Sequence, residues 1–167
     1  SLKNSIKFVL TNNLFYGDSI KVTYTPGNVI ASDRGPLDAF SEFVVENKLP
    51  MPTWHPIPEK IEAEDYVLQF GTGTETTSDT GGGLNVGWTE TGDWMIYAID
   101  NTSEEEQFEI KFRLAAESTG SFFTYHIDNV KAGQVTVPAT GGWQVFQSVI
   151  KKIAIPKGKH YLKIAVV

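Results

Sequence analysis

The sequence predicts an all-β protein whose main part is a β-sandwich of the jelly-roll type. Apolar and polar residues alternate with a period of two in several segments, which is the pattern of half-buried strands. Turn-forming stretches rich in Gly, Asn, Asp and Thr separate these segments. Helical periodicity is nearly absent, and only residues 37–43 have the pattern of a short helical turn. Many short strands at this spacing are typical of a sandwich or jelly roll.

The alternation places the individual strands. Between residues 108 and 114, four apolar side chains alternate with three charged ones, which predicts a strand with one buried face. The same pattern, in shorter form, predicts strands over 6–10, 20–24 and 162–166. Glycine-rich turns are expected over 71–74 and 81–83.

Four prolines mark a boundary between two parts of the chain. Residues 49–58 include Pro50, Pro52, Pro56 and Pro58, a spacing that favours extended backbone and a semi-rigid linker. The part before it, 1–48, offers two or three strands, which is too few to bury a core. The part after it, 59–167, holds the larger share of the chain and is expected to form the main β-domain.

The composition excludes several classes of partner and site. The 167 residues carry a formal net charge of −6, whereas nucleic acids and anionic membranes select clustered Lys and Arg. We therefore expect neither nucleic acid nor membrane as a partner. No apolar run approaches the roughly 20 residues of a membrane span. The absence of cysteine excludes disulfides, thiolate metal sites and cysteine nucleophiles.

Five short motifs follow one another in the second part of the chain: IEAEDY at 61–66, GGGLNVGW at 81–88, GDW at 92–94 with Tyr97, RLA at 113–115 and TGGWQ at 140–144. Together they resemble family 6 carbohydrate-binding modules. The resemblance implies a β-jelly-roll that binds glycans without cleaving them and that is usually appended to a secreted glycoside hydrolase. It also implies a further strand after residue 167, so the jelly-roll is expected to lack its last strand.

The first part of the chain resembles a different module. Residues 17–27, together with Phe40 and 45–47, are similar to the second half of the immunoglobulin-like domains that follow the catalytic domains of such hydrolases. This similarity implies that 1–48 is the C-terminal part of an immunoglobulin-like β-sandwich and that a catalytic domain lies upstream.

Two tryptophans are the candidate sugar-binding residues. The resemblance implies that a sugar is held between two aromatic rings on loops, at Trp88 and Trp143. Both have polar, turn-like neighbours in the sequence, although burial in the core is the alternative for each. Trp94 stands in an apolar run and is expected to pack within a strand, and Trp54 is expected to cover a seam between the domains.

Two polar residues near Trp88 are candidates for hydrogen bonds to sugar hydroxyls. Glu90 is two residues beyond the ring and is a charged acceptor, which strengthens such bonds. Asn85 is expected to contribute an amide. The alternatives are a solvated turn carboxylate for Glu90 and local backbone hydrogen bonding for Asn85.

Glu62 and Glu64 are the candidate metal ligands. At positions i and i+2 they are expected on one face of a strand, where two carboxylates repel unless a cation compensates them. Calcium prefers carboxylate and carbonyl oxygens, and the resemblance implies a structural calcium near this pair. Surface charge without metal is the alternative.

The leading hypothesis is a non-catalytic module that targets a parent secreted glycoside hydrolase, of cellulase or xylanase type, to β-linked polysaccharide by aromatic stacking. No serine elbow, metal-binding histidine spacing or carboxylate pair in a pocket-forming context is present in the sequence. Two other hypotheses remain open. One is a structural or interdomain β-sandwich without sugar binding, and the other is a part of the hydrolase itself.

Overall fold

The computed structural model describes residues 7–27, 29–30 and 34–167. The chain divides into two compact units, Ser1–Pro52 and Thr53–Val167. Every regular element of the described residues is a β-strand, so the predicted all-β class is confirmed. No helix long and apolar enough to cross a membrane occurs in this part of the chain.

The first unit contains one antiparallel strand pair. Strand β1 (Ile20–Tyr24) pairs with β2 (Phe40–Val45), as the alternation over 20–24 predicts for its first strand. The strand predicted over 6–10 is wrong for residues 7–10, which have no regular structure and lie exposed, and Ile6 lies outside the described residues. Alternation alone does not make a strand where no neighbouring strand supplies hydrogen bonds. The immunoglobulin-like assignment stays a prediction.

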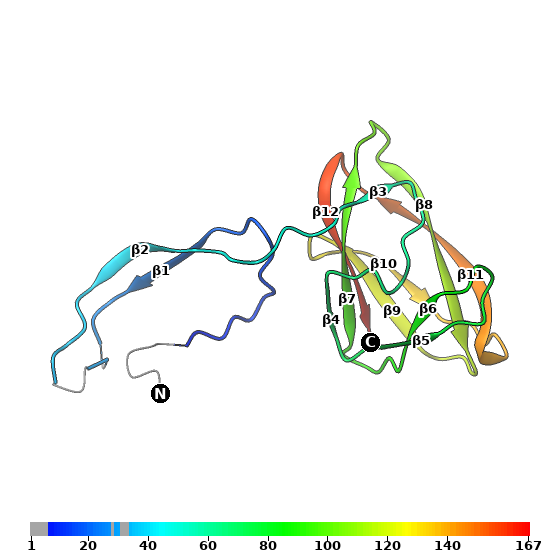
Figure 1. Ribbon diagram of the computed structural model, residues 1–167, viewed down its shortest axis with the longest axis horizontal. Helices are drawn as coiled ribbons and strands as arrows, with labels where there is room; N and C mark the ends of the chain where they lie inside the picture. Colours follow the sequence, from blue (N-terminus) through cyan, green and yellow to red (C-terminus); the bar gives the residue numbers. More distant parts are fainter. Residues whose placement is uncertain (1–6, 28, 31–33) are drawn as a thin grey trace. The chain divides into compact units, whose positions relative to one another are not determined.

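The second unit is the jelly-roll module, and its strands form three sheets (Figure 1). The largest sheet has the order β10-β9-β12-β7-β3, with β4 also on β7. Strand β8 pairs with β11, and β5 pairs with β6. The bounds are β3 (His55–Ile57), β4 (Leu68–Phe70), β5 (Gly73–Thr76), β6 (Leu84–Gly87), β7 (Trp94–Asn101), β8 (Gln107–Ala116), β9 (Phe122–Ile127), β10 (Val130–Thr136), β11 (Gly142–Ala154) and β12 (Gly158–Val166).

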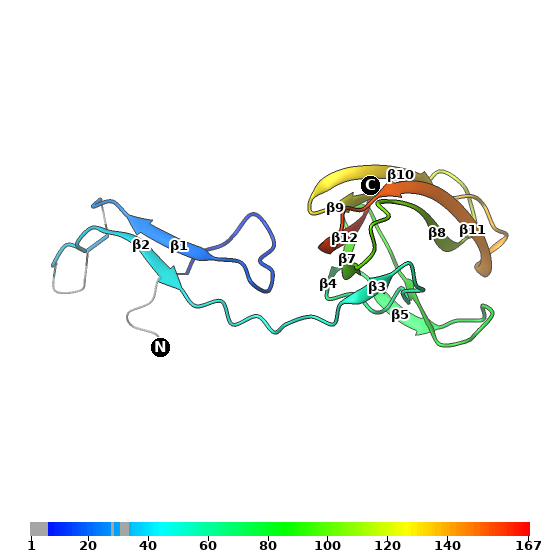
Figure 2. The ribbon, with the colours of Figure 1, turned by 90° about the horizontal axis from the view of Figure 1, so that it is seen from above.

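The core of this unit lies between the large sheet and the β8–β11 pair. Figure 2 shows β11 curving beside β10, with β8 next to it, so that these strands close one side of the sandwich. Alternate residues of β7 fill the interior, and Phe112 of β8 meets Phe123 edge-on at 5.0 Å between ring centroids. The cluster consists of Met95, Tyr97, Ile99, Phe112, Phe123, Tyr125, Ile127, Val135, Ile153, Ile155 and Leu162.

The start of the module lies earlier than the sequence suggests. The unit boundary falls after Pro52, so the second half of the segment predicted as a linker, 49–58, belongs to the module. His55–Ile57 form β3, which runs parallel to β7 at the edge of the large sheet. Proline is tolerated on an edge strand because its missing N–H can face away from the ladder, and Pro56 occupies such a strand here.

Trp54, predicted to cover a seam between domains, has its partner inside the module. Its ring packs on Tyr161 of β12 at 5.3 Å between centroids. The ammonium group of Lys159 lies 5.1 Å from the centre of the same ring, a cation–π contact. These contacts fix the residues that precede β3 against the module's own sheet.

Candidate functional site

Trp88 stands at the exit of β6 with its ring mostly in solvent. Its side chain is 64% exposed, and its φ of 53° lies in the left-handed region that few non-glycine residues adopt. The six-membered part of the indole lies against Gly73 of β5, because a Cβ built on that glycine would be 2.9 Å from Cε3 of Trp88. One edge of the ring therefore contacts the backbone of β5, and most of the rest is exposed to solvent.

Trp143 is the second residue of β11 and is 66% exposed. The loop before it is anchored by Thr140, which is buried. The N–H of Ala116 donates to Thr140 Oγ1 at 2.8 Å, and the N–H of Thr140 donates to the Ala116 carbonyl at 2.9 Å. The burial alternative is thus wrong for both tryptophans, and two large apolar rings face solvent on short, well-anchored segments.

A polar cluster joins the two ring-bearing segments. The side-chain N–H₂ of Gln144 donates to Glu75 Oε1 and to Asn85 Oδ1, each at 3.0 Å. The amide of Asn85 in turn donates to Glu75 Oε1 at 3.3 Å, and Glu75 and Asn85 are direct partners in the β5–β6 register. The oxygen of the Gln144 amide accepts the N–H of Ser78 at 2.8 Å. The start of β11 is therefore fastened to the β5–β6 hairpin.

This cluster brings the tryptophans to one region of the module. Trp143 is the neighbour of Gln144, and Trp88 is three residues beyond Asn85, which is about 10 Å along an extended strand. Glu75 on β5 is opposite Asn85 in the register and accepts the amide of Gln144. This part of the module therefore carries two exposed aromatic rings and nearby carboxylates, a combination that suits a ligand with both apolar faces and hydroxyl groups.

The loop that carries Trp88 is closed by a buried carboxylate. Asp93 Oδ2 accepts the N–H of Glu90 at 2.7 Å, and the N–H of Asp93 donates to the Glu90 carbonyl at 3.1 Å. Glu90 keeps its own carboxylate exposed, as expected for a residue that meets a ligand or water. Asn85, by contrast, uses its side chain within the polar cluster, and the predicted local backbone role is absent among the bonds of the described residues.

Trp94 is half-buried on β7, in agreement with the strand packing that its apolar run predicts. The ring of Phe70 stacks on the Trp94 ring at 6.4 Å with an interplanar angle of 18°, and Lys163 Nζ lies 5.2 Å from the centre of the Trp94 ring.

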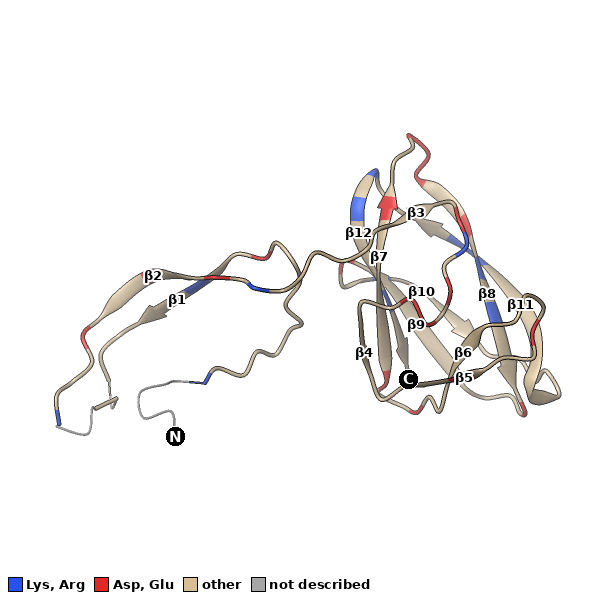
Figure 3. Cartoon of the chain, in the orientation of Figure 1, with Lys and Arg blue, Asp and Glu red and all other residues tan. Residues whose placement is uncertain are grey.

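The Lys and Arg positions of β8 and those of β12 lie in separate parts of the module and do not form one basic cluster (Figure 3).

The prediction of a shared strand face for Glu62 and Glu64 is wrong. Residues 62–65 form a turn, in which the N–H of Asp65 donates to the Glu62 carbonyl at 3.1 Å. Glu62 is exposed and pairs with Lys60 Nζ at 2.5 Å. Glu64 points elsewhere, because its Oε1 lies 3.9 Å from the position of a Cβ on Gly83. Its Oε2 is buried and has no hydrogen-bond partner in the described structure.

The turn that holds Glu64 is anchored from the core. The Tyr97 hydroxyl donates to the Ala63 carbonyl at 2.7 Å. Burial, with the phenol of Tyr66 and the carboxylate of Glu64 nearby, raises the pKa of Tyr97 far above its usual range. The hydroxyl therefore stays protonated and available as a donor to the Ala63 carbonyl.

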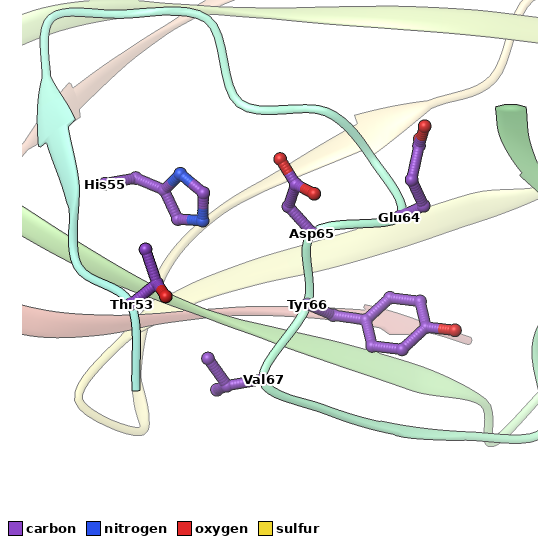
Figure 4. A pocket seen from close by; sticks show the side chains of 6 residues that line it. All are labelled: Thr53, His55, Glu64, Asp65, Tyr66 and Val67. Atoms are coloured by element: carbon purple, nitrogen blue, oxygen red, sulfur yellow. The ribbon is translucent and has the colours of Figure 1, made fainter. Parts of the chain in front are cut away.

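A pocket lies on the same side of β7 as β3, and neither exposed tryptophan lines it. In Figure 4 the imidazole of His55 and the carboxylate of Asp65 point toward the same space, whereas Glu64 and Tyr66 point away. The lining residues are Thr53, His55, Glu64, Asp65, Tyr66 and Val67. No group of three or more His, Asp or Glu side chains placed to hold a metal ion occurs among the described residues.

The comparison with known families decides the assignment of the module. Residues 62–167 match the profile described as "Carbohydrate binding module (family 6)". The chain belongs to this family. The match covers the jelly-roll unit from residue 62 onward, and both exposed tryptophans and the polar cluster are within the matched residues.

Two solved structures of such modules share the fold and about a third of the residues. The module CBM6cm-2 from Cellvibrio mixtus lichenase 5A, solved with cellotriose, is 35% identical, with a TM-score of 0.59 over 64% of this chain and 84% of that chain. A β-1,3-glucan-binding module from Bacillus halodurans is 32% identical, with a TM-score of 0.62 over 68% of this chain and 87% of that chain. These neighbours confirm the carbohydrate-binding β-sandwich.

A curated relative shows the same stretch within a longer protein. The clotting factor G alpha subunit of Tachypleus tridentatus is 32% identical over 108 residues, or 64% of this chain. The matched stretch spans only 16% of that subunit.

Glu75 and Gln144 are the residues of this region that the sequence analysis missed. Gln144 directly follows Trp143, and Glu75 is on the same face of β5 as Gly73, within two residues of the glycine-rich turn predicted over 71–74. The signal that unites them is spatial, because their hydrogen bond joins positions 69 residues apart.

Proposed function

We propose that this family 6 module binds β-linked glucan by stacking glucose rings on Trp88 and Trp143. The observation that carries the proposal is the exposure of both indoles, 64% and 66%, on segments joined through Gln144. A solvent-exposed tryptophan has an unfavourable apolar surface that a sugar face can cover. The two solved relatives, one described with cellotriose and one as binding β-1,3-glucan, support glucan as the class of ligand.

Two carboxylates supply the polar contacts in this proposal. Glu75 accepts both amide hydrogen bonds of the cluster at Oε1, which leaves Oε2 for a sugar hydroxyl. Glu90 extends the acceptor surface on the other side of Trp88, and Asn85 contributes by holding Glu75 in place. Hydrogen bonds to charged acceptors are stronger than neutral ones, so these residues orient a sugar that the rings hold.

Two stacked rings with a few hydrogen bonds give a modest affinity. We expect a Kd of about 1 mM to 1 µM for a single site, or roughly −4 to −8 kcal/mol. Such binding suits a module that anchors a longer secreted protein, such as a glycoside hydrolase, to a polymer while permitting release and rebinding. The lichenase origin of one relative supports this role.

Affinity electrophoresis of the whole chain tests the glucan assignment. Gels containing laminarin, mixed-linkage β-glucan, cellulose derivative or xylan are compared with a gel without polysaccharide. Retardation in one or more of the glucan gels is expected. Equal mobility in all gels would contradict the proposal and favour an interaction sandwich, whereas retardation in xylan alone would replace glucan by xylan as the ligand. Release of reducing sugar from any of these polymers would instead favour an enzyme.

We also propose a structural calcium ion at Glu64. Calcium takes carboxylate and carbonyl oxygens in flexible geometry, and the buried, unpartnered Oε2 of Glu64 fits this preference. The side chain of Glu64 approaches the glycine turn at Gly83, whose backbone carbonyls would be the further ligands. Glu62 would join as a second ligand by exchanging its ion pair with Lys60 for the metal. The bound ion would supply positive charge that offsets the burial of the carboxylate.

A further inference from the structure

Two glycines stand on either side of Thr72, in the segment that leads from β4 into β5, and each is in very close contact with the loop of Trp88. A Cβ built on Gly71 would lie 1.7 Å from Asp93 Oδ1, and one on Gly73 would lie 2.9 Å from Cε3 and 3.4 Å from Cζ3 of Trp88. Carbon atoms in contact prefer separations of about 3.5–4.0 Å. Both ends of the loop 88–93 therefore rest on backbone that has no side chain.

The two contacts have different consequences. Asp93 is buried and closes the loop through the N–H of Glu90, so the space above Gly71 serves the fold of the loop. The ring of Trp88 is exposed and can swing away from β5 without disturbing the core. A side chain at Gly73 would therefore change the position of the Trp88 ring, whereas the loop 88–93 would still fold.

We infer that Gly73 is a positioning residue for the Trp88 ring: by lacking a side chain it lets one edge of the indole approach the backbone of β5 closely, and this contact fixes where the ring stands for a ligand. This inference rests on the proposed sugar binding at Trp88. The contact is made by three neighbouring atoms of the six-membered ring, Cε3, Cζ3 and Cδ2, and stacking needs a ring face held at a suitable angle to the sugar. The contact with Gly73 thus sets the position of the ring relative to β5.

Gly73→Ala is the direct test, because φ at Gly73 is not in the left-handed region. The added methyl group then acts through the contact with the ring and not through backbone strain. We expect the variant to fold, to change the near-ultraviolet circular dichroism of the tryptophans, and to bind laminarin oligosaccharides about three- to tenfold more weakly, because a displaced ring keeps only part of its stacking contact.

A double-mutant cycle with Trp88→Ala separates positioning from general damage. If Gly73 acts through the ring, Gly73→Ala has no further effect on binding once the ring is gone. Gly133→Ala serves as the matched control, because its Cβ would lie 2.1 Å from the Tyr125 hydroxyl oxygen in the β9–β10 pair, away from the site. This control should lower the melting temperature and leave the affinity of the folded protein unchanged.

The outcomes distinguish the inference from the proposed function. Weaker binding by Gly73→Ala that disappears in the Trp88→Ala background supports the inference. Wild-type affinity of Gly73→Ala beside weak binding by Trp88→Ala overturns it and leaves the sugar site intact. An additive loss in the double variant also overturns it, because Gly73 would then act elsewhere. Wild-type affinity of Trp88→Ala alone removes the proposed site at Trp88.

Discussion

Removal of the Trp143 ring is the sharpest perturbation of the proposed site. The side chain is 66% exposed, so Trp143→Ala removes little core packing, and we expect a change in the free energy of unfolding within about 0.5 kcal/mol. A sugar laid on one face of the indole would cover about 70 Å² of apolar surface, which at about 25 cal/mol per Å² is roughly 2 kcal/mol. A loss of that size weakens binding by about 30-fold.

Isothermal titration with a laminarin oligosaccharide, paired with thermal melts, measures both quantities for the same sample. Ile150→Ala is a matched control, because Ile150 is also an exposed apolar residue of β11, at 54%, but pairs with Lys111 well away from Gln144. Trp143→Phe should retain part of the affinity, since a smaller ring still stacks. Affinity of Trp143→Ala within twofold of the wild type, with an unchanged melt, would refute the stacking role.

Three further outcomes follow from the geometry. Glu75→Ala should weaken glucan binding more than Glu90→Ala, because Glu75 also holds the hairpin to β11; equal losses in titration would show that Glu75 has no special place. Asp79→Asn should lower the melting temperature at neutral pH, where two hydrogen bonds from Arg113 of 2.6 and 2.7 Å hold the pKa of Asp79 below its usual range. The difference from the wild type should shrink as the pH falls through that lowered pKa, since protonation of Asp79 removes the same stabilisation, and a difference independent of pH would contradict it. Calcium should raise the melting temperature of the wild type relative to chelator, and Glu64→Gln should abolish the increase; identical melts in calcium and chelator would exclude the metal.

The sequence predicts the strands of the module better than it predicts how they meet. The alternation in β8 specifies both a strand and its buried face, and Phe112 lies in the core accordingly. The polar neighbours of Trp88 and Trp143 indicate exposure because turns lie on the surface. These predictions succeed because the information is local.

The sequence predicts less well where a turn interrupts an alternating pattern or where the partner of a residue is distant. Glu62 and Glu64 have the spacing of a strand face, yet a turn separates their side chains and Lys60 takes one of them. The role of Glu75 depends on Gln144, which nothing near it in the sequence reveals. Pro56 suggests a linker by composition, but the edge of β7 had room for a short parallel strand.

The early entry of the chain into the sheet at β3 has a practical consequence for transplanting the module. A fragment that begins at residue 59 would lack Trp54, whose ring packs on Tyr161. It would also lack β3, the strand that pairs with Ile99–Asn101 of β7. A bare sheet edge recruits strands from other molecules, and such a fragment would self-associate. Grafts onto another protein should therefore begin at Thr53, so that Trp54 and β3 are retained and cover this edge of the sheet.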